Sequence, residues 1–313
     1  MKATSKELIK NKIPKVKGII KKNYNLSKLT WFKVGGNAEL YFVPRDKEDL
    51  INFLKNLDKK IPIQILGAGS NTLIRDGGIS GVTLKLTKSF CEIIYLRNQK
   101  FIAGAGLSCV KLARTLANKN LKGLEFFSGI PGTVGGAIKM NAGAYGSQTS
   151  DYLEKITTVD RNGKIKEYSK NEIKMTYRNS GIKKNDTIIQ GIFKCERGDA
   201  YTIKEKIKKL NELRKTTQPI SLKTSGSTFK NPLKLKAWKL IKDSGCANLR
   251  IGDAKVSSLH CNFIENKGLA NAQDIEELGK TIISKVKKNF GIKLTWEIKI
   301  IGSKKKYRRL FNG

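Results

Sequence analysis

The 313-residue sequence is 39% hydrophobic and 28% charged, which is typical of a globular protein with one large domain or two to three smaller ones. It has no apolar run of 18 residues and no apolar leader, so we expect neither a membrane span nor a secretory signal. The formal net charge of +36 is compatible with nucleic-acid binding, but the lysines are spread over the whole chain, which favours a general preference for lysine. A single histidine, His260, excludes a histidine-rich metal site, and five cysteines without a CxxC pair predict reduced thiols in a cytoplasmic, metal-free protein.

The first part of the chain is predicted to alternate short helices and strands. Residues 1–25 form a lysine-rich arm, helical or loose. Apolar residues recur with a helical period in 48–60, and Ser108 is the expected N-cap of a second helix over 108–120. Short apolar or alternating runs predict strands over 61–69, 81–86 and 100–106.

The later part shows the same mixture. Residues 151–198 are predicted to be rich in strands, with a turn at 161–164. An amphipathic helix over 200–215 is broken by "TTQP" (216–219), where we expect a domain boundary. Further helices are predicted over 235–245 and 271–291, and strands over 254–266 and 294–302. Because no regular βαβ repeat is present, the sequence predicts an α+β fold with two or three subdomains.

Glycines concentrate in loops that follow predicted strands. Residues 67–71 read "GAGSN", residues 104–108 read "GAGLS", and the 24 residues 123–146 hold seven of the 29 glycines. Neither short loop completes GxGxxG, because Thr72 and Cys109 occupy the third position, and the first loop precedes a strand; the Rossmann interpretation is rejected. Loops with few side chains suit backbone contacts to an anion such as the diphosphate of a large cofactor.

Seven stretches, in order, resemble the UDP-N-acetylenolpyruvoylglucosamine reductase (MurB) family of flavoenzymes. The long glycine stretch and "SGSTFKNP" are the most specific, and the resemblance covers roughly residues 25–302. The stretches are "LTWFKVGGNAE" (29–39), "LGAGSNTLIRDGG" (66–78), "GLEFFSGIPGTVGGAIKMNAGAYG" (123–146), "YRNS" (177–180), "SGSTFKNP" (225–232), "VSSLHCNFIEN" (256–266) and "LTWEIKIIG" (294–302).

The resemblance implies an α+β architecture. It consists of an FAD-binding domain of the para-cresol methylhydroxylase type, with two α+β subdomains, and a C-terminal α+β substrate domain. The chain is shorter than relatives that insert a tyrosine-bearing loop, so the subtype without that loop is expected. The expected division is an N-terminal arm (1–25), an FAD-binding region (26–215, subdomains about 26–95 and 96–215), a substrate-binding domain (216–303) and a basic tail (304–313).

The resemblance also implies the reaction. NADPH would reduce FAD, which would reduce the enolpyruvyl ether of a UDP-sugar to UDP-N-acetylmuramate for peptidoglycan synthesis. No nicotinamide preference can be read from the residues themselves. The positions that match the cofactor loops are Gly67, Ala68, Gly69, Ser70, Asn71, Gly129, Ile130, Pro131, Gly132, Thr133, Gly135 and Gly136.

Three residues match the family's catalytic positions. Arg178 would bind the substrate carboxylate, for which a planar guanidinium offers two parallel hydrogen bonds. Ser227 would give a proton to the basic carbanion or enolate formed after hydride addition, and Glu297 would polarise that donor or the enolate. Considered alone, an arginine could form a surface ion pair, a serine could cap a turn, and a strand glutamate could face solvent.

Other positions receive weaker assignments. Tyr177, Lys230 and Asn231 are candidate substrate contacts, and His260 is interpreted as a structural histidine. Many relatives carry glycine where this chain has Asn248 and at the third position of "IGDA", Asp253. These departures leave the three catalytic positions unchanged.

Two alternatives stay open at this stage. Another FAD-linked oxidoreductase of the same fold is one, although no histidine or cysteine is placed as a covalent flavin anchor. A basic nucleic-acid-binding protein is the other, although the glycine loops nearly lack arginine and aromatic residues. The reductase interpretation predicts a monomer with a UDP-sugar substrate and no nucleic-acid or membrane partner.

Overall fold

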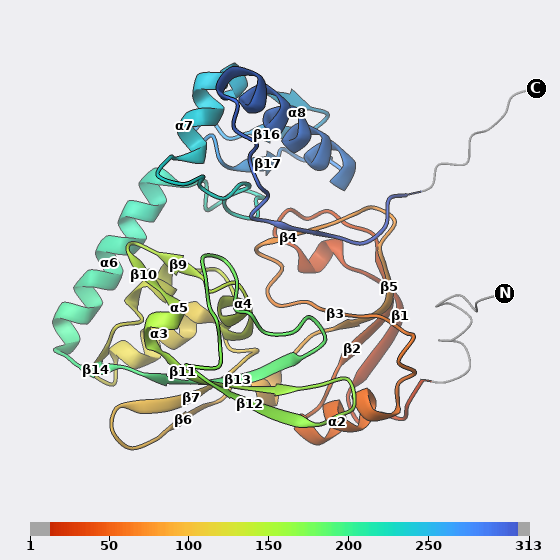
Figure 1. Ribbon diagram of the computed structural model, residues 1–313, viewed down its shortest axis with the longest axis vertical. Coiled ribbons are helices and arrows are strands. Elements are labelled where there is room, and N and C mark those ends of the chain that lie inside the picture. Colours follow the sequence, from red (N-terminus) through yellow and green to blue (C-terminus); the bar gives the residue numbers. More distant parts are fainter. Residues whose placement is uncertain (1–12, 306–313) are drawn as a thin grey trace, which may run out of the picture. The chain divides into compact units, whose positions relative to one another are not determined.

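A computed structural model describes residues 13–305 (Figure 1). The described chain divides into two compact units. Unit 1 comprises the residues up to 21, 40–68 and 81–216, and unit 2 comprises 22–39, 69–80 and the residues from 217 onward. Unit 2 therefore draws two short segments from the region that the sequence assigned to FAD binding. The predictions for residues 1–12 and 306–313 lie outside the described residues.

The first sheet, most of which belongs to unit 1, has the strand order β1-β2-β5-β3. The expectation of an N-terminal arm is wrong for residues 19–25, which form edge strand β1; lysine side chains are common on edge strands because they discourage pairing with other chains. The carboxylate of buried Asp49 fixes the approach to β1, since it accepts hydrogen bonds from Lys17 N and Gly18 N, both at 2.8 Å. The elements of this part are β1 (Ile19–Asn25), β2 (Asn37–Val43), α2 (Lys47–Asn56), β3 (Ile63–Ile65) and β5 (Ile79–Leu84).

The second sheet, in unit 1, is antiparallel, in the order β12-β11-β13-β7-β6. Helices α3, α4 and α5 lie on one side of this sheet (Figure 1), and α6 closes the unit at its C-terminal end. Its elements are β6 (Ile93–Tyr95), β7 (Lys100–Gly104), α3 (Cys109–Ala117), β8 (Leu121–Lys122), α4 (Val134–Lys139), β9 (Gly143–Ala144), β10 (Ser147–Gln148), α5 (Thr149–Tyr152), β11 (Leu153–Val159), β12 (Ile165–Ser169), β13 (Thr187–Lys194), β14 (Glu196–Arg197) and α6 (Ala200–Thr217).

Unit 2 has its own apolar core, built on helix α8 and a small sheet. The sheet order is β15-β16-β17, and β18 pairs in parallel with β4. Buried apolar residues of α8, including Ile275, Leu278 and Ile282, pack in this core. The elements are β4 (Thr72–Ile74), α7 (Ala237–Ile241), a π-helical turn η4 (Lys242–Cys246), β15 (Arg250–Ile251), β16 (Ala254–Val256), β17 (Ile264–Asn266), α8 (Ala272–Phe290) and β18 (Lys299–Ile301). Short 3₁₀ turns occupy Ser27–Leu29, Lys88–Phe90 and Glu125–Gly129.

The helix predictions are confirmed in place, and their ends follow capping chemistry. Ser108 Oγ accepts a hydrogen bond from Lys111 N, as expected for an N-cap. α2 ends four residues early, where Lys59 Nζ donates to the carbonyls of Leu54 and Lys55. α8 begins with a capping box at Asn271 and ends at Gly291, whose left-handed φ of 69° suits glycine.

The expected strand over 294–302 is wrong for most of its length. Only Lys299–Ile301 forms a strand, β18, and Trp296 contributes an isolated bridge to Phe229. Side-chain alternation in "LTWEIKIIG" reflects a segment with one buried face, which a single extended chain can have without a sheet partner.

No helix among residues 13–305 is long and apolar enough to cross a bilayer.

Candidate functional site

The glycine loops of unit 1 pack closely against neighbouring residues. A Cβ on Gly67 would lie 3.0 Å from Thr133 Oγ1, and a Cβ on Gly135 would lie 2.8 Å from that of Ala105. Thr133 also caps α4, accepting a hydrogen bond from Gly136 N. The sequence interpretation attributed these glycines to the cofactor alone, but packing within the protein already excludes a side chain at Gly135 and leaves little room for one at Gly67.

A half-buried lysine stands beside the first loop. Lys85 Nζ donates to Gly67 O at 2.5 Å. Burial lowers the pKa of this ammonium, and the nearby Cys91 thiol only partly offsets the effect. A cation that is partly removed from water beside a glycine loop suits a phosphate group. The sequence analysis missed Lys85, because in "GVTLKL" it is one lysine among 62 basic residues.

The rest of the "GAGSN" loop belongs to unit 2. Gly69 has φ +68°, and a Cβ there would lie 2.1 Å from Leu29 O. Its own carbonyl accepts a hydrogen bond from Trp31 N at 3.1 Å. Gly69 is therefore required by the backbone of the neighbouring segment as well as by its conformation.

Arg178 lies in unit 1, at the end of the long glycine stretch. Its Nη2 donates to Gly143 O at 3.3 Å, and its guanidinium lies 4.8 Å from the ring centroid of Tyr177. The backbone of Arg178 has φ +59°, which costs energy for a residue with a Cβ and is common at functional positions. Asn141 fixes the residue before Tyr177 by donating to Thr176 O at 3.2 Å.

Ser227 and Glu297 lie together in unit 2. Glu297 N donates to Thr228 O at 2.9 Å, so the two predicted catalytic segments are joined by their backbones. Asn71, predicted from the cofactor loop, donates from Nδ2 to Glu297 O at 3.2 Å, and its carbonyl accepts from Lys299 N at 2.9 Å. A Cβ on Gly226, which has φ +76°, would lie 4.0 Å from Ser70 O.

One buried amide, absent from the sequence assignments, holds the segment after Ser227. Asn262 Oδ1 accepts from Phe229 N at 2.9 Å, and its Nδ2 donates to Phe229 O at 2.8 Å. Asn262 O also accepts from Thr228 N at 2.7 Å. The sequence signal was an asparagine within the apolar stretch "HCNFI", where a buried amide needs partners.

Trp296 fixes the residue before Glu297 by packing. Its ring centroid lies 4.9 Å from that of Phe229, and a Cβ on Gly279 would lie 1.9 Å from its Cη2 atom. Gly279 in the middle of α8 therefore makes room for the indole ring.

The weaker candidates have structural contacts of their own. Lys230 N donates to Thr295 O at 2.9 Å, and Asn231 Oδ1 accepts from Ala237 N at 3.0 Å, at the start of α7. The Tyr177 side chain is exposed. His260 Nδ1 accepts from Asn262 N at 3.2 Å and burial lowers its pKa, which agrees with the structural interpretation.

Both departures from the family pattern have a structural setting. Asn248 has φ +61°, a left-handed conformation that glycine adopts freely and asparagine tolerates. Asp253 pairs with Arg250 and accepts a hydrogen bond from Leu269 N at 2.9 Å.

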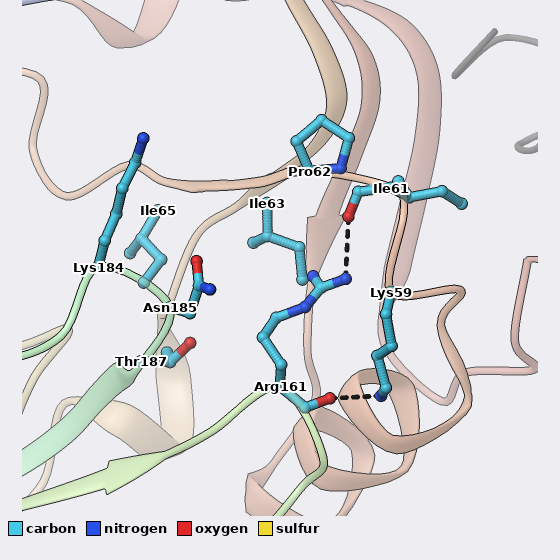
Figure 2. A pocket seen from close by; sticks show the side chains of 9 residues that line it. All are labelled: Lys59, Ile61, Pro62, Ile63, Ile65, Arg161, Lys184, Asn185 and Thr187. Atoms are coloured by element: carbon cyan, nitrogen blue, oxygen red, sulfur yellow. Dashed lines mark hydrogen bonds between the residues drawn. The ribbon is translucent and has the colours of Figure 1, made fainter. Parts of the chain in front are cut away.

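Unit 1 also contains a cationic pocket (Figure 2). Arg161 lies at its centre and donates from Nη2 to Ile61 O at 2.9 Å, while its Nη1 is buried and has no hydrogen-bond partner among the described residues. The other lining residues are Lys59, Ile61, Pro62, Ile63, Ile65, Lys184, Asn185 and Thr187.

The pocket and the first glycine loop share strand β3. Ile63 and Ile65 line the pocket. Hydrogen bonding between β3 and β5 continues to Leu66, so the chain stays extended up to Gly67, which falls on the same side of the strand as Ile63 and Ile65. Two residues of a strand span about 7 Å, so the pocket begins near the loop. A buried guanidinium nitrogen without a partner suits a polar ligand.

The structure thus places Arg178 and the 129–136 loop in unit 1, and Ser227, Glu297, Ser70 and Asn71 in unit 2. Within residues 13–305, no group of three or more histidine, cysteine, aspartate or glutamate residues could hold a metal ion. The chemistry available is that of polar side chains beside cationic, glycine-lined loops.

Comparisons with known proteins bear on both halves of the chain. Residues 38–169 match the protein family "FAD binding domain", and residues 218–301 match "UDP-N-acetylenolpyruvoylglucosamine reductase, C-terminal domain". The expected α+β fold, with an FAD-binding domain and a C-terminal domain of the reductase type, is thereby confirmed.

Whole-chain relatives agree. The chain is 47% identical to the UDP-N-acetylenolpyruvoylglucosamine reductase of Rickettsia canadensis, covering 93% of this chain and 98% of that protein. It is 46% identical to one from Rickettsia bellii, covering 93% and 96%. The crystal structure of the reductase from Thermus caldophilus matches with a TM-score of 0.79 and 30% identity, covering 91% of this chain and 99% of that one.

Proposed function

The chain belongs to the UDP-N-acetylenolpyruvoylglucosamine reductase family, and from that premise we propose which of its residues hold the cofactor and act on the substrate. It is an FAD-dependent, NADPH-linked oxidoreductase of peptidoglycan precursor synthesis that reduces the enolpyruvyl ether of a UDP-sugar. When bound, FAD would supply the hydride-transfer chemistry that links NADPH to the enolpyruvyl group.

The residues present suit FAD. Gly67, Ala68, Gly69, Ser70, Asn71 and the 129–136 loop are the residues that would hold it. The Lys85 ammonium, held on Gly67 O, would neutralise diphosphate charge. Close packing of the Thr133 side chain against Gly67 supports this assignment, because it places the two loops side by side before any ligand binds.

We assign the adenosine end of FAD to the Arg161 pocket. Ile63 and Ile65 offer an apolar wall, Arg161 has an unpartnered nitrogen among the described residues, and Asn185 and Thr187 offer polar groups. FMN lacks the adenosine part and provides the test. We expect Ile65→Glu to weaken FAD binding at least about tenfold and to leave FMN binding within about twofold. Equal loss of both flavins with an unchanged melting temperature would contradict the assignment.

Arg178 is proposed to bind the substrate carboxylate. A left-handed backbone and the bond to Gly143 O hold the guanidinium at the end of the glycine stretch. As negative charge spreads from C2 into the carboxylate, a preorganised guanidinium stabilises it more strongly than the starting ether. Replacement by lysine would keep the charge and lose the two parallel hydrogen bonds.

Ser227 is proposed to protonate C2 of the reduced enolpyruvyl group, with Glu297 assisting. A serine hydroxyl is a weak acid, so it can donate only to a strongly basic partner such as an enolate. The bond from Glu297 N to Thr228 O supports a joint role, because it holds the two residues on adjoining backbone. Lys230, Asn231 and Tyr177 are proposed as substrate contacts near these groups in sequence.

We further propose that the protein acts as a cytoplasmic monomer without a nucleic-acid partner. The spread of lysines over the whole chain supports this view of the charge. Gel filtration at two salt concentrations, with and without nucleic acid, would test both points.

The activity itself has a direct spectroscopic test. Purified protein should be yellow, and NADPH should bleach its flavin absorbance. The enolpyruvyl UDP-sugar should then restore it. Bleaching without reoxidation by that substrate would favour another FAD-linked oxidoreductase, and a colourless protein that fails to take up FAD would contradict both flavoenzyme assignments.

A further inference from the structure

Unit 2 carries an exposed apolar surface immediately after the "FKNP" motif. Leu233 is 95% exposed, Leu235 43% and Trp238 40%. Leu235 N donates to Pro232 O at 3.0 Å, which closes a tight turn with Lys234 in a left-handed conformation. The turn presents Leu233 at its tip, and α7 follows it (Figure 1).

The buried side of α7 shows that this exposure is not a poorly packed core. Ala237, Leu240 and Ile241 are buried in the apolar core of unit 2, so the helix already satisfies its packing. Trp238 is not part of this buried face, and its ring centroid lies 6.4 Å from that of His260. Leu259, beside His260 in the sequence, is 51% exposed. Leu233, Leu235 and Trp238 are exposed within six residues of the chain, and neighbouring exposed apolar side chains mark a binding face more often than isolated ones do.

Positive charge surrounds these apolar side chains. Lys234, Lys236, Lys239 and Lys242 are all exposed, and residues 230–243 contain a single acidic residue, Asp243. Leucine and tryptophan with lysines beside them are the composition of segments that lie in the interface of an anionic bilayer. There the apolar groups enter the headgroup region, and the flexible lysine stems reach the phosphates.

We propose that the surface formed by Leu233, Leu235 and Trp238 with Lys234, Lys236, Lys239 and Lys242, termed the α7 surface, binds the surface of an anionic lipid bilayer. Contact of this kind is peripheral and needs no spanning helix. It departs from the expectation of no membrane partner, which rested on the absence of a long apolar run. The charge complementarity favours lipid over a second copy of the chain, since two such surfaces would place like charges together.

The whole protein is strongly basic, so the test must separate the α7 surface from general attraction. Vesicles of phosphatidylcholine containing phosphatidylglycerol would be sedimented with the full-length, FAD-loaded protein. The variant Leu233→Ser/Leu235→Ser/Trp238→Ser keeps every charge. Its matched control, Tyr201→Ser/Leu213→Ser/Leu269→Ser, removes three other exposed apolar side chains.

We expect the α7-surface variant to lower the vesicle partition coefficient at least about tenfold, and the control to change it by less than about twofold. Two variants that remove positive charges, one on the α7 surface and one elsewhere, follow the same design. Lys234→Gln/Lys236→Gln/Lys239→Gln/Lys242→Gln should weaken binding more than Lys204→Gln/Lys208→Gln/Lys209→Gln/Lys215→Gln on α6. Equal losses within either pair would overturn the proposal.

Tryptophan fluorescence gives a measurement that does not depend on the general electrostatic attraction between the basic protein and the anionic vesicles. Vesicles containing brominated lipid should quench the emission of the wild type. Trp238→Phe should abolish that quenching, because a phenylalanine side chain keeps the apolar contact without the indole fluorophore. Quenching that persists in this variant would overturn the proposal. So would a protein that sediments as a dimer through the α7 surface and ignores the vesicles.

Discussion

The glycine loops of unit 1 and the Ser227–Glu297 segment of unit 2 reach fixed positions by different means. Unit 1 uses missing side chains, because Gly67 leaves room for the Thr133 side chain and Gly135 lies directly against Ala105. Unit 2 uses a buried amide, because Asn262 bonds both backbone groups of Phe229. A cofactor loop gains from a bare backbone, whereas a segment proposed to hold a proton-donating serine gains from hydrogen bonds that fix its direction.

From this contrast we expect the largest loss of stability when a bulkier side chain replaces a closely packed glycine of unit 1. Gly135→Val places a branched side chain where a Cβ would already lie 2.8 Å from that of Ala105 and 3.0 Å from Ala105 O. We expect a loss of about 4 kcal/mol in unfolding free energy of the apoprotein, measured by urea denaturation. Gly136→Ala is the matched control, because the atom nearest to its Cβ, Thr133 Oγ1, would lie at 3.4 Å. Equal losses from the two changes would contradict the role of close packing.

The corresponding change in unit 2 removes hydrogen bonds. Asn262→Ala would leave the buried N–H and carbonyl of Phe229 without partners. Each unsatisfied group costs about 1–3 kcal/mol, so we expect a loss of about 3 kcal/mol. Turnover should fall as well, since Ser227 lies two residues before Phe229. A variant with unchanged melting temperature and turnover would show that Asn262 is dispensable.

An ion pair in unit 2 predicts a pH dependence. Arg75 Nε lies 2.8 Å from Glu276 Oε2, and the hydrogen bond to Arg75, with help from Lys280, lowers the pKa of this carboxyl to about 2 from 4.5. A lowered pKa stabilises the fold fully above about pH 4.5, and the contribution disappears as the pH falls toward 2.

Glu276→Gln should therefore cost about 2 kcal/mol at neutral pH and progressively less toward pH 2, as read from urea unfolding across that range. Neighbouring Glu277, which is exposed, supplies the control Glu277→Gln. A difference between Glu276→Gln and the wild type that stays constant from pH 6 to 2 would contradict the assignment.

The smallest effect is expected where the chain departs from its relatives. Asn248→Gly keeps the left-handed conformation at φ +61°, so the unfolding free energy should change by less than about 0.5 kcal/mol. Asn248→Val should cost about 1–2 kcal/mol, because a β-branched residue is strained there. Calorimetric unfolding of both variants would show whether the left-handed backbone conformation explains a preference for glycine at position 248.

Much of this arrangement was predictable from the sequence, and the rest depended on long-range contacts. Helical periodicity located α3, α6 and α8, whereas the motifs supply Ser227 and Glu297 as predictions. Lys85 and Asn262 were missed because their importance comes from what they touch across 18 and 33 residues. The strand expected over 294–302 was wrong, because most of this segment lacks a sheet partner. Trp296 is fixed there by packing against Gly279 and Phe229 and forms only an isolated bridge.

The central claim is that Ser227 acts on the substrate after the flavin has been reduced, and rapid-mixing kinetics of the two half-reactions test it most directly. In Ser227→Ala, flavin reduction by NADPH should stay within about twofold of the wild type. Reoxidation by the enolpyruvyl UDP-sugar should slow by about 10²–10³, the cost of one preorganised group. Ser225→Ala, in the same loop, should leave the second step near normal. Equal slowing of both half-reactions in Ser227→Ala would contradict the role assigned to Ser227.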